Sequence, residues 1–168
     1  VDSSSPSFEL NILTEDFSDT NTVEVNIIDQ GLGTYEYSLD NLPFQSYSKF
    51  YNIEPGNHFI TIRDISGSCI NKTMDFFILS YPKFFTPNND GINDTWNITD
   101  LENNLESYII IYDRFGKIIT KIKPYEKGWD GYNSNGDKLP SSDYWFLVKY
   151  NKNNVLREFR ANFSLLRR

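Results

Sequence analysis

The sequence predicts an all-β fold made of two tandem antiparallel β-sandwich domains. Aromatic residues make up 16% of the 168 residues, whereas alanine, the strongest helix former, occurs once, at Ala161. Because aromatic and β-branched side chains favour strands, this composition argues against a helical bundle. Short stretches of alternating apolar and polar residues, each bounded by turn-forming residues, recur along the chain and indicate strands with one buried face.

Four strands are predicted in the first half from this alternation. Val23, Val25 and Ile27 alternate with polar neighbours, and the same spacing recurs in the segments 34–39, 58–62 and 74–78. Turn-forming residues separate these segments at 31–33, 40–41, 54–56 and 66–67. Short strands at this spacing are typical of a sandwich of two antiparallel sheets.

The strand pattern begins again after Pro82, which lacks an N–H donor and therefore suits a connection or a sheet edge. Strands are predicted in the second half at 108–114, 117–122, 144–150 and 159–165. Residues 128–140 indicate a loop, and only residues 101–108 suit a short helical turn. We therefore expect one domain at 1–80 and a second at 81–168, joined in a semi-rigid tandem by a very short linker near Ser80–Pro82.

The net charge of −7 is unevenly distributed between these halves. Residues 1–80 carry 3 basic and 12 acidic residues, a charge of −9, whereas residues 81–168 carry 13 basic and 11 acidic residues, a charge of +2. The acidic half repels nucleic acid and anionic lipid, and the mixed signs of the second half form no basic stripe along which a phosphate backbone could lie. Nucleic-acid binding is therefore not expected.

We expect neither a membrane-spanning helix nor a signal peptide in this sequence. No apolar run approaches the roughly 20 residues that a transmembrane helix needs, and the stretch Val1–Leu10 does not have the pattern of a signal peptide. Because the sequence begins with valine in place of a start methionine, we expect a fragment of a longer protein, and we expect this fragment to be a monomer.

The single cysteine and the single histidine exclude most metal and disulfide chemistry. Cys69 has no second cysteine with which to form a disulfide or a cysteine-based zinc site, and it suits a half-buried position near a turn. His58 is in phase with Ile60 and Ile62, which indicates a histidine packed at a sheet edge. A Cys69–His58 catalytic dyad is the alternative, but neither residue lies in a nucleophile motif.

Five segments of the second half occur in an order that resembles a known module. The longest is Phe84–Trp96, with the sequence FFTPNNDGINDTW, and the others are Ile111–Lys117, Gly128–Gly131, Leu139–Phe146 and Phe163–Arg168. Together they resemble the gliding-motility-associated C-terminal domain, which is the type B sorting domain of the Bacteroidota type IX secretion system. The resemblance extends over residues 84–168.

The first half resembles, more loosely, the Ig-like repeat modules of large gliding adhesins and related cell-surface proteins. The segments that carry this resemblance are Tyr35–Asp40, Phe44–Ser46, Pro55–His58 and Arg63–Cys69. The two resemblances imply an Ig-like adhesin-type repeat domain at 1–80, followed by a type B sorting domain at 81–168.

The family implies a function in protein export. Its C-terminal domain is a folded signal that the type IX machinery reads in the periplasm after Sec export, and a PorP/SprF-type outer-membrane protein is the implied partner. The signal directs a large passenger, such as a gliding adhesin, to the cell surface or the medium. The upstream repeat would belong to that passenger.

A signal that is read after folding needs a docking surface, and the end of the last predicted strand is the candidate. We assign partner recognition to the final residues, which are Phe163, Ser164, Leu165, Leu166, Arg167 and Arg168. If the strand lies at a sheet edge, a partner can add a strand to it through backbone hydrogen bonds, with the two arginines setting the orientation. If the strand is central, only Arg167 and Arg168 protrude.

The loop from Asn88 to Asp94 concentrates side-chain oxygens around Gly91 and has two interpretations. Calcium prefers several oxygen ligands, and Asp90, Asn93 and Asp94 are the candidates for a Ca²⁺ site, although the glutamate that closes an EF-hand is missing. Alternatively, these side chains accept hydrogen bonds from nearby N–H groups in a turn rich in asparagine and aspartate.

The three tryptophans support an alternative function. Trp96, Trp129 and Trp145 would form a carbohydrate-stacking surface if they were exposed together, which is typical of a carbohydrate-binding tail of a secreted glycan-degrading enzyme. An indole beside an Asp-Gly loop more often caps a small core, with its N–H bonded to the loop. This second interpretation applies to Trp96 and Trp129.

Catalysis is not expected. Asp130, Asp137 and Asp143 could suggest a paired-carboxylate glycosidase, but they lie in turn-rich sequence where aspartate is common. No HExxH, GxSxG or phosphate-binding glycine loop occurs. We expect a protein that is not an enzyme and has no cofactor apart from the candidate Ca²⁺.

Overall fold

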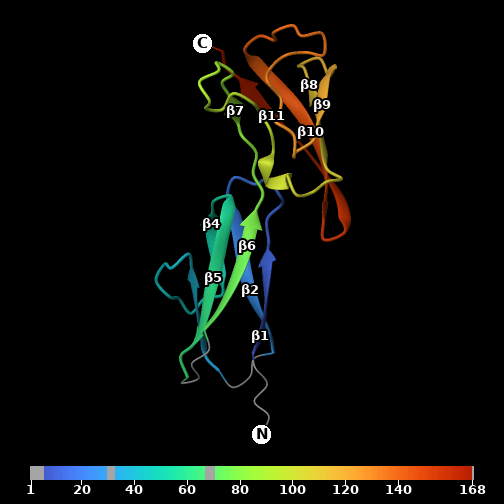
Figure 1. Cartoon of the computed structure of the whole chain (residues 1–168). Coiled ribbons are helices and arrows are strands. Elements are labelled where there is room, and N and C mark those ends of the chain that lie inside the picture. The colour runs from blue at the N-terminus through green and yellow to red at the C-terminus, as the bar shows by residue number, and fades with distance from the viewer. Residues whose placement is uncertain (1–5, 30–32, 67–70, 168) are drawn as a thin grey trace. The chain divides into compact units, whose positions relative to one another are not determined.

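The computed structural model describes residues 6–29, 33–66 and 71–167. Within these residues the regular elements are strands, apart from a 3-10 helix at Thr99–Leu101, and the all-β prediction is confirmed (Figure 1). No helix in the described part of the chain is long and apolar enough to span a membrane. The chain divides into two compact units, Val1–Ser80 (unit 1) and Tyr81–Arg168 (unit 2).

Unit 1 is a sandwich of two three-stranded antiparallel sheets, ordered β1-β2-β4 and β3-β5-β6. Its strands are β1 (Ser7–Ile12), β2 (Asn21–Asp29), β3 (Tyr35–Leu39), β4 (Lys49–Ile53), β5 (Gly56–Asp64) and β6 (Asn71–Ile78). The inward-facing residues of both sheets form one hydrophobic core, in which Val23, Ile60 and Ile62 are at most 1% exposed. The period-two alternation seen in the sequence therefore places these side chains between the sheets.

His58 is held as a packed residue in unit 1. Its Nδ1 lies 2.6 Å from Oδ2 of Asp40, its Nε2 lies 2.8 Å from the Glu54 carbonyl oxygen, and the ring stacks on Phe76. The histidine is packed as predicted, but the predicted edge position is wrong, because His58 lies on β5, the central strand of its sheet. Cys69 lies outside the described residues, so the structure says nothing of the alternative dyad.

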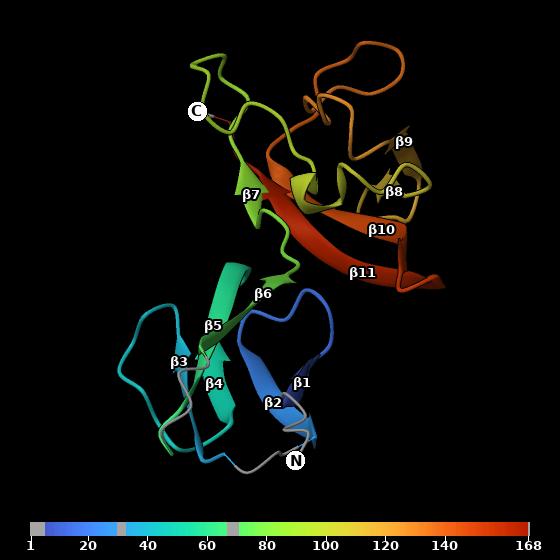
Figure 2. The ribbon, with the colours of Figure 1, turned by 60° about the horizontal axis from the view of Figure 1, so that its bottom comes forward.

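Unit 2 contains one five-stranded sheet in the order β7-β11-β10-β8-β9. Its strands are β7 (Phe84–Phe85), β8 (Tyr108–Tyr112), β9 (Ile118–Ile122), β10 (Ser142–Lys152) and β11 (Val155–Leu165). All neighbours are antiparallel except β7, which lies parallel to the end of β11 (Figure 2). The long β10–β11 hairpin turns through Asn153 and Asn154, whose φ angles of 53° and 61° suit a tight type I′ connection.

One face of this sheet is buried and the other is largely solvated. The inner face includes Ile109, Ile111, Phe146 and Val148, all at most 1% exposed. The loop before β8 and the loop after β9 form the layer that covers the buried face. An isolated antiparallel bridge between Trp96 and Trp129 joins these two loops. Loops rich in aromatic residues thus supply most of the second layer of unit 2.

The structure contains three strands that the alternation did not predict, namely β1, β4 and β7. In β4, Asn52 has a φ of 56°, and this left-handed residue interrupts the alternation. The helical turn predicted at 101–108 is not found there. The structure has a 3-10 helix at Thr99–Leu101 instead.

Candidate functional site

The predicted recognition residues lie at the end of β11, and the structure separates them into buried and exposed members. Phe163 is 1% exposed and Leu165 is 0% exposed, because both face the core of unit 2. A partner cannot contact these two side chains while the unit is folded, so their assignment to the recognition surface is corrected. Ser164 faces the opposite side and donates its hydroxyl to Asp143 Oδ1 at 2.6 Å.

Leu166 and Arg167, the next two residues of the predicted set, differ in exposure. Leu166 is 45% exposed. Arg167 is half-buried and hydrogen-bonded, and it does not protrude as the sequence suggested. Arg168 lies outside the described residues.

The sequence left open whether the last strand lies at a sheet edge or inside the sheet. In the structure one part of β11 is an edge and the other part is central. The Ser164 N–H donates to the Lys83 carbonyl at 2.9 Å, and the Leu166 N–H donates to the Phe85 carbonyl at 3.0 Å. The end of β11 is therefore enclosed between β7 and β10. Before Ser164, β11 pairs with β10 alone, so its other edge is unpaired among the described strands of unit 2.

Phe163 lies at the centre of a group of rings that we call the aromatic cluster. The Trp96 indole stacks on Phe163 with a centroid distance of 3.9 Å and an interplanar angle of 10°. The other rings around Phe163 belong to Phe85, Trp129, Tyr144 and Phe146. Four of the sequence segments that carry the family resemblance therefore meet at one side chain of the last strand.

Backbone and indole hydrogen bonds hold the two buried tryptophans in the cluster. The N–H of each donates to the carbonyl oxygen of the other at 2.9 Å. The indole N–H of Trp96 donates to Pro82 and that of Trp129 to Tyr132. With exposed fractions of 0% and 3%, these side chains are core residues, whereas Trp145 is 42% exposed on the outer face of the sheet. The three tryptophans do not form a shared surface.

The Arg167 side chain ties two loops, the one after β7 and the one between β9 and β10, to the last strand, and we call this arrangement the Arg167 latch. Its Nε donates to the Leu139 carbonyl at 2.8 Å, its Nη2 to the Gly131 carbonyl at 2.8 Å, and its Nη1 to the Pro87 carbonyl at 3.4 Å. The backbone N–H of Arg167 also donates to the Ser141 hydroxyl at 2.8 Å. A planar guanidinium with several fixed donors suits such a convergence of carbonyl groups.

The latch and the cluster require glycine at two positions of the Gly128–Gly131 segment. Gly131 has a φ of +84°, and a Cβ there would lie 2.6 Å from Nη2 of Arg167 and 2.8 Å from a Leu165 methyl carbon. Gly128 has a φ of +97°, and a Cβ would lie 2.7 Å from the Trp96 carbonyl oxygen. Both the left-handed backbone and the close approach exclude a larger side chain.

Tyr144 links the cluster to the same loops. Its hydroxyl donates to the Pro140 carbonyl at 2.9 Å. Burial raises the pKa of this phenol, and the nearby Arg167 guanidinium partly opposes that shift. Tyr144 therefore acts as a neutral donor at physiological pH.

In the loop around Gly91, the carboxylates are bound to backbone N–H groups. Asp94 Oδ1 accepts from Asn88 at 3.0 Å and from Asn89 at 2.6 Å, and Oδ2 accepts from Gly91 at 2.8 Å. These hydrogen bonds, with the Gly91 N–H first, hold the pKa of Asp94 below its usual value. Asp90 similarly accepts from the Ile92 N–H at 2.8 Å.

This geometry favours the turn interpretation of the loop. The N–H groups bonded to Asp94 place positive charge where a cation would have to bind. Asn93 contributes its backbone carbonyl, which accepts from Thr86 at 2.8 Å. Within the described residues no group of three or more histidine, cysteine, aspartate or glutamate side chains is arranged to hold a metal. Calcium binding by Asp90, Asn93 and Asp94 stays a prediction of the sequence.

The three aspartates considered for catalysis each accept a hydrogen bond within the turn-rich segment or from β11. Asp130 Oδ1 accepts from the Tyr132 N–H at 3.1 Å, and Asp137 Oδ2 accepts from the Asn133 amide at 3.0 Å. Asp143 accepts from the Ser164 hydroxyl, as described above. Asp130 and Asp137 therefore shape the loop, and Asp143 joins β10 to β11.

Unit 2 is thus a small β domain whose C-terminal strand is built into its own core. Comparison with known families agrees with this description: residues 79–162, half of the chain, match the family described as the CHU_C Type IX secretion signal domain. The chain belongs to this family. It carries a type IX secretion signal, which is not a catalytic domain, and this signal implies interaction with the secretion machinery and export to the cell surface or extracellular space.

Similar solved structures are more distant. Dimeric latent PorU from Porphyromonas gingivalis is 13% identical with a TM-score of 0.33, over 99% of this chain and 21% of PorU. A two-domain fibronectin type III segment of chicken tenascin is 10% identical with a TM-score of 0.29, over 95% of this chain and 98% of that segment. The BSP domain of a biofilm-associated protein is 12% identical with a TM-score of 0.25, over 90% of this chain and 27% of that one.

This chain spans about a fifth of the PorU chain, and TM-scores this low support no functional inference. No curated protein matches the chain.

We predict that Arg167→Ala destabilises unit 2 by about 2–4 kcal/mol, because it removes charged donors from three carbonyl groups. Arg167→Lys should recover only part of this loss, since an ammonium cannot reach all three acceptors. Urea unfolding followed by tryptophan fluorescence measures the change, because all three tryptophans lie in unit 2. Arg114→Ala, at an exposed turn position, is the control and should change stability by no more than about 0.5 kcal/mol. Equal stability of Arg167→Ala and the unmodified chain contradicts the latch.

We predict that Asp94→Asn lowers the melting temperature at pH 7 and that the difference disappears on acidification. Because the folded-state pKa of Asp94 is lowered, its carboxylate contributes stability above the unfolded pKa and loses this contribution as the pH falls through the folded pKa. The two melting curves should therefore converge below about pH 4. Glu102→Gln, which also removes one exposed carboxylate, controls for net charge. A difference that stays constant from pH 7 to pH 3 refutes the role of the carboxylate.

A calcium titration distinguishes the two interpretations of the loop. A ligand that binds only the folded state raises the melting temperature as its concentration increases. Because N–H groups already occupy Asp94, we expect the melting temperature of the chain to be the same with calcium as with a chelator. A rise with calcium that Asp90→Asn abolishes would support the Ca²⁺ site instead.

Proposed function

We propose that unit 2 is a type B sorting domain that a PorP/SprF-type outer-membrane partner reads as a folded body. In this proposal, unit 1 is an Ig-like repeat at the end of a passenger, which is a surface adhesin involved in gliding. The family match supports the sorting role, and the six-stranded sandwich of unit 1 supports a repeat module. The observation that carries the folded-state part of the proposal is the burial of the last strand.

The buried strand argues against recognition as an extended peptide. To present Phe163 and Leu165 to a partner, the chain would have to break the aromatic cluster and the Arg167 latch. Loss of two such core side chains costs several kcal/mol, on the order of the whole stability of a small domain. A partner that binds the exterior of unit 2 avoids this cost.

The unpaired edge of β11 is the docking surface that we propose. The N–H groups of Ser164 and Leu166 point away from β10 toward β7. Because backbone groups alternate along a strand and the β10–β11 register has no shift, the backbone groups of Leu156, Glu158, Arg160 and Asn162 point to that same side. A strand of the partner can hydrogen-bond to these groups.

Export of a reporter fused to this chain tests the sorting role. Removal of residues 81–168 should leave the reporter inside the cell, whereas removal of residues 1–80 should leave export unchanged. Removing only Ser164–Arg168 is a poor test of docking, since it also deletes Leu165 and the latch and so unfolds the unit. Normal export without residues 81–168 overturns the proposed function.

A proline at Glu158 tests the docking edge separately. We predict that Glu158→Pro reduces export by about tenfold or more, because it removes an outward N–H and places a ring against an incoming strand, while the bonds to β10 remain. Glu158→Ala removes the same carboxylate and keeps the N–H, so it should export normally. Tryptophan fluorescence confirms that both variants are folded. Normal export of Glu158→Pro refutes edge docking while leaving the sorting role intact.

A further inference from the structure

The outer face of the unit 2 sheet carries aromatic side chains that neither the core nor the proposed docking edge uses. Trp145 on β10 lies directly opposite Tyr112 on β8 and opposite Asn162 on β11. Paired residues of antiparallel strands project from the same face with their Cβ atoms close together. Tyr112, Trp145 and Asn162 therefore form a row across the outer face of the sheet, with Trp145 in the middle.

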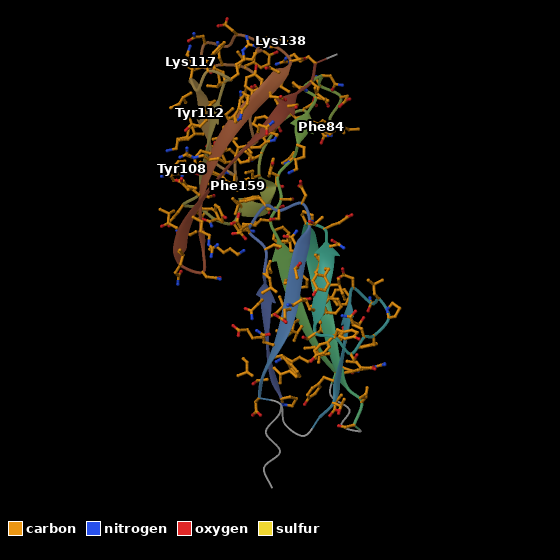
Figure 3. The ribbon with its side chains drawn as sticks, turned by 180° about the vertical axis from the view of Figure 1, so that it is seen from behind. Phe84, Tyr108, Tyr112, Lys117, Lys138 and Phe159 are labelled. Atoms are coloured by element: carbon orange, nitrogen blue, oxygen red, sulfur yellow. The ribbon has the colours of Figure 1, made fainter. Side chains whose placement is uncertain are left out.

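A hollow of about 430 Å³ lies beside this row. It is lined by residues of β8, the β8–β9 turn, β10 and β11, namely Tyr112, Asp113, Arg114, Gly116, Trp145, Phe146, Leu147 and Arg160. Leu147, 8% exposed, belongs to the next row of the same face, opposite Arg160. Figure 3 shows Tyr108 and Tyr112 along β8, with Lys117 beyond Tyr112 at the turn.

Two arginines, Arg114 and Arg160, outnumber the single carboxylate in the lining of the hollow. Arg114 is exposed in the turn, with its guanidinium 4.9 Å from the Phe115 ring centroid. The Arg160 side chain is 71% exposed, and its contact with Glu158 is long, at 3.4 Å. The one carboxylate in the lining, Asp113, already accepts hydrogen bonds from the Phe115 and Lys117 N–H groups at 2.8 and 2.9 Å.

We propose that this hollow binds an acidic sugar residue, a hexuronate unit of a polysaccharide. The apolar C–H face of a pyranose ring packs against the exposed face of Trp145 beside Tyr112. The carboxylate of the sugar pairs with the Arg160 and Arg114 guanidinium groups, which match its planar geometry. Asn162, which lies opposite Trp145 at the side of the hollow, supplies an amide that bonds a ring hydroxyl in this arrangement.

The size and charge of the site favour this ligand over a protein or a nucleic acid. A hollow of this volume suits a small ring, whereas a stable protein interface buries about 800 Å² on each partner. A nucleic acid needs several cationic contacts along its backbone, but the chain has a net charge of −7 and the hollow has two arginines. The site uses side chains of the outer face, so it is separate from the backbone edge proposed for docking.

Binding of tetragalacturonate to the 168-residue chain tests the proposal, with galactotetraose as a neutral probe of equal length. We expect the acidic probe to bind about tenfold more tightly than the neutral one, the contribution of a charge-assisted contact. Trp145→Ala should weaken binding of the acidic probe by about tenfold or more, and Trp145→Phe by less. Arg160→Gln combined with Arg114→Gln should abolish the preference for the acid.

The control variant is Leu156→Ala, which truncates another exposed side chain of β11 and should leave binding unchanged. Export of the reporter should be normal with Trp145→Ala, which separates this site from the sorting role. The proposal is overturned if tetragalacturonate does not bind, or if both probes bind equally. It is also overturned if an oligothymidylate binds as tightly as tetragalacturonate and loses this binding in Trp145→Ala. A third contrary result is that Trp145→Ala blocks export and leaves sugar binding intact.

Discussion

The half-buried guanidinium of Arg167 is the interaction on which the arrangement of unit 2 depends. The layer opposite the sheet is made mostly of loops, which cannot satisfy one another through a strand ladder. Arg167 supplies donors to three carbonyl groups in two such loops, at Pro87 after β7 and at Gly131 and Leu139 between β9 and β10. The same loops carry Trp96 and Trp129 over Phe163. One side chain near the C-terminus therefore holds together segments that are far apart in the sequence.

This architecture makes the core of unit 2 depend on residues 163–167. Phe163, Leu165 and Arg167 belong to the last residues, and each is needed for the core or for the latch. A chain that ends before Phe163 lacks the ring on which Trp96 stacks. Such dependence means that the exterior of unit 2 forms only when these residues are present. The proposed docking edge of β11 stays exposed while Phe163 and Leu165 lie in the core.

Much of the fold could be predicted from the sequence because its strands are regular. The alternation of β2, β5 and β10 matches their inner and outer faces. Strand β7 could not be predicted in this way, because two residues give no period and their pairing with Ser164 and Leu165 is non-local. The core positions of Trp96 and Trp129 were predictable from the Asp-Gly loops beside them.

The candidate site was predicted less well, since residue type alone did not distinguish the alternatives. An arginine is usually solvated, and the hydrogen bonds of Arg167 to loop carbonyl groups were needed to reveal the latch. Asparagine and aspartate are common both in calcium loops and in turns, so the direction of the N–H groups around Asp94 was needed to favour the turn. The family resemblance located the signal, but it did not show which of its residues are buried.

Hydrogen exchange of the β11 amides tests most directly whether the terminal strand is part of the core. The N–H groups of Ser164 and Leu166 are bonded to β7 and its neighbour Lys83, whereas those of Glu158 and Arg160 point to the unpaired edge. The account predicts that Ser164 and Leu166 exchange more slowly than Glu158 and Arg160 by a factor on the order of a thousand. Equal and rapid exchange at all four amides would contradict it, because the end of the chain would then be a frayed tail.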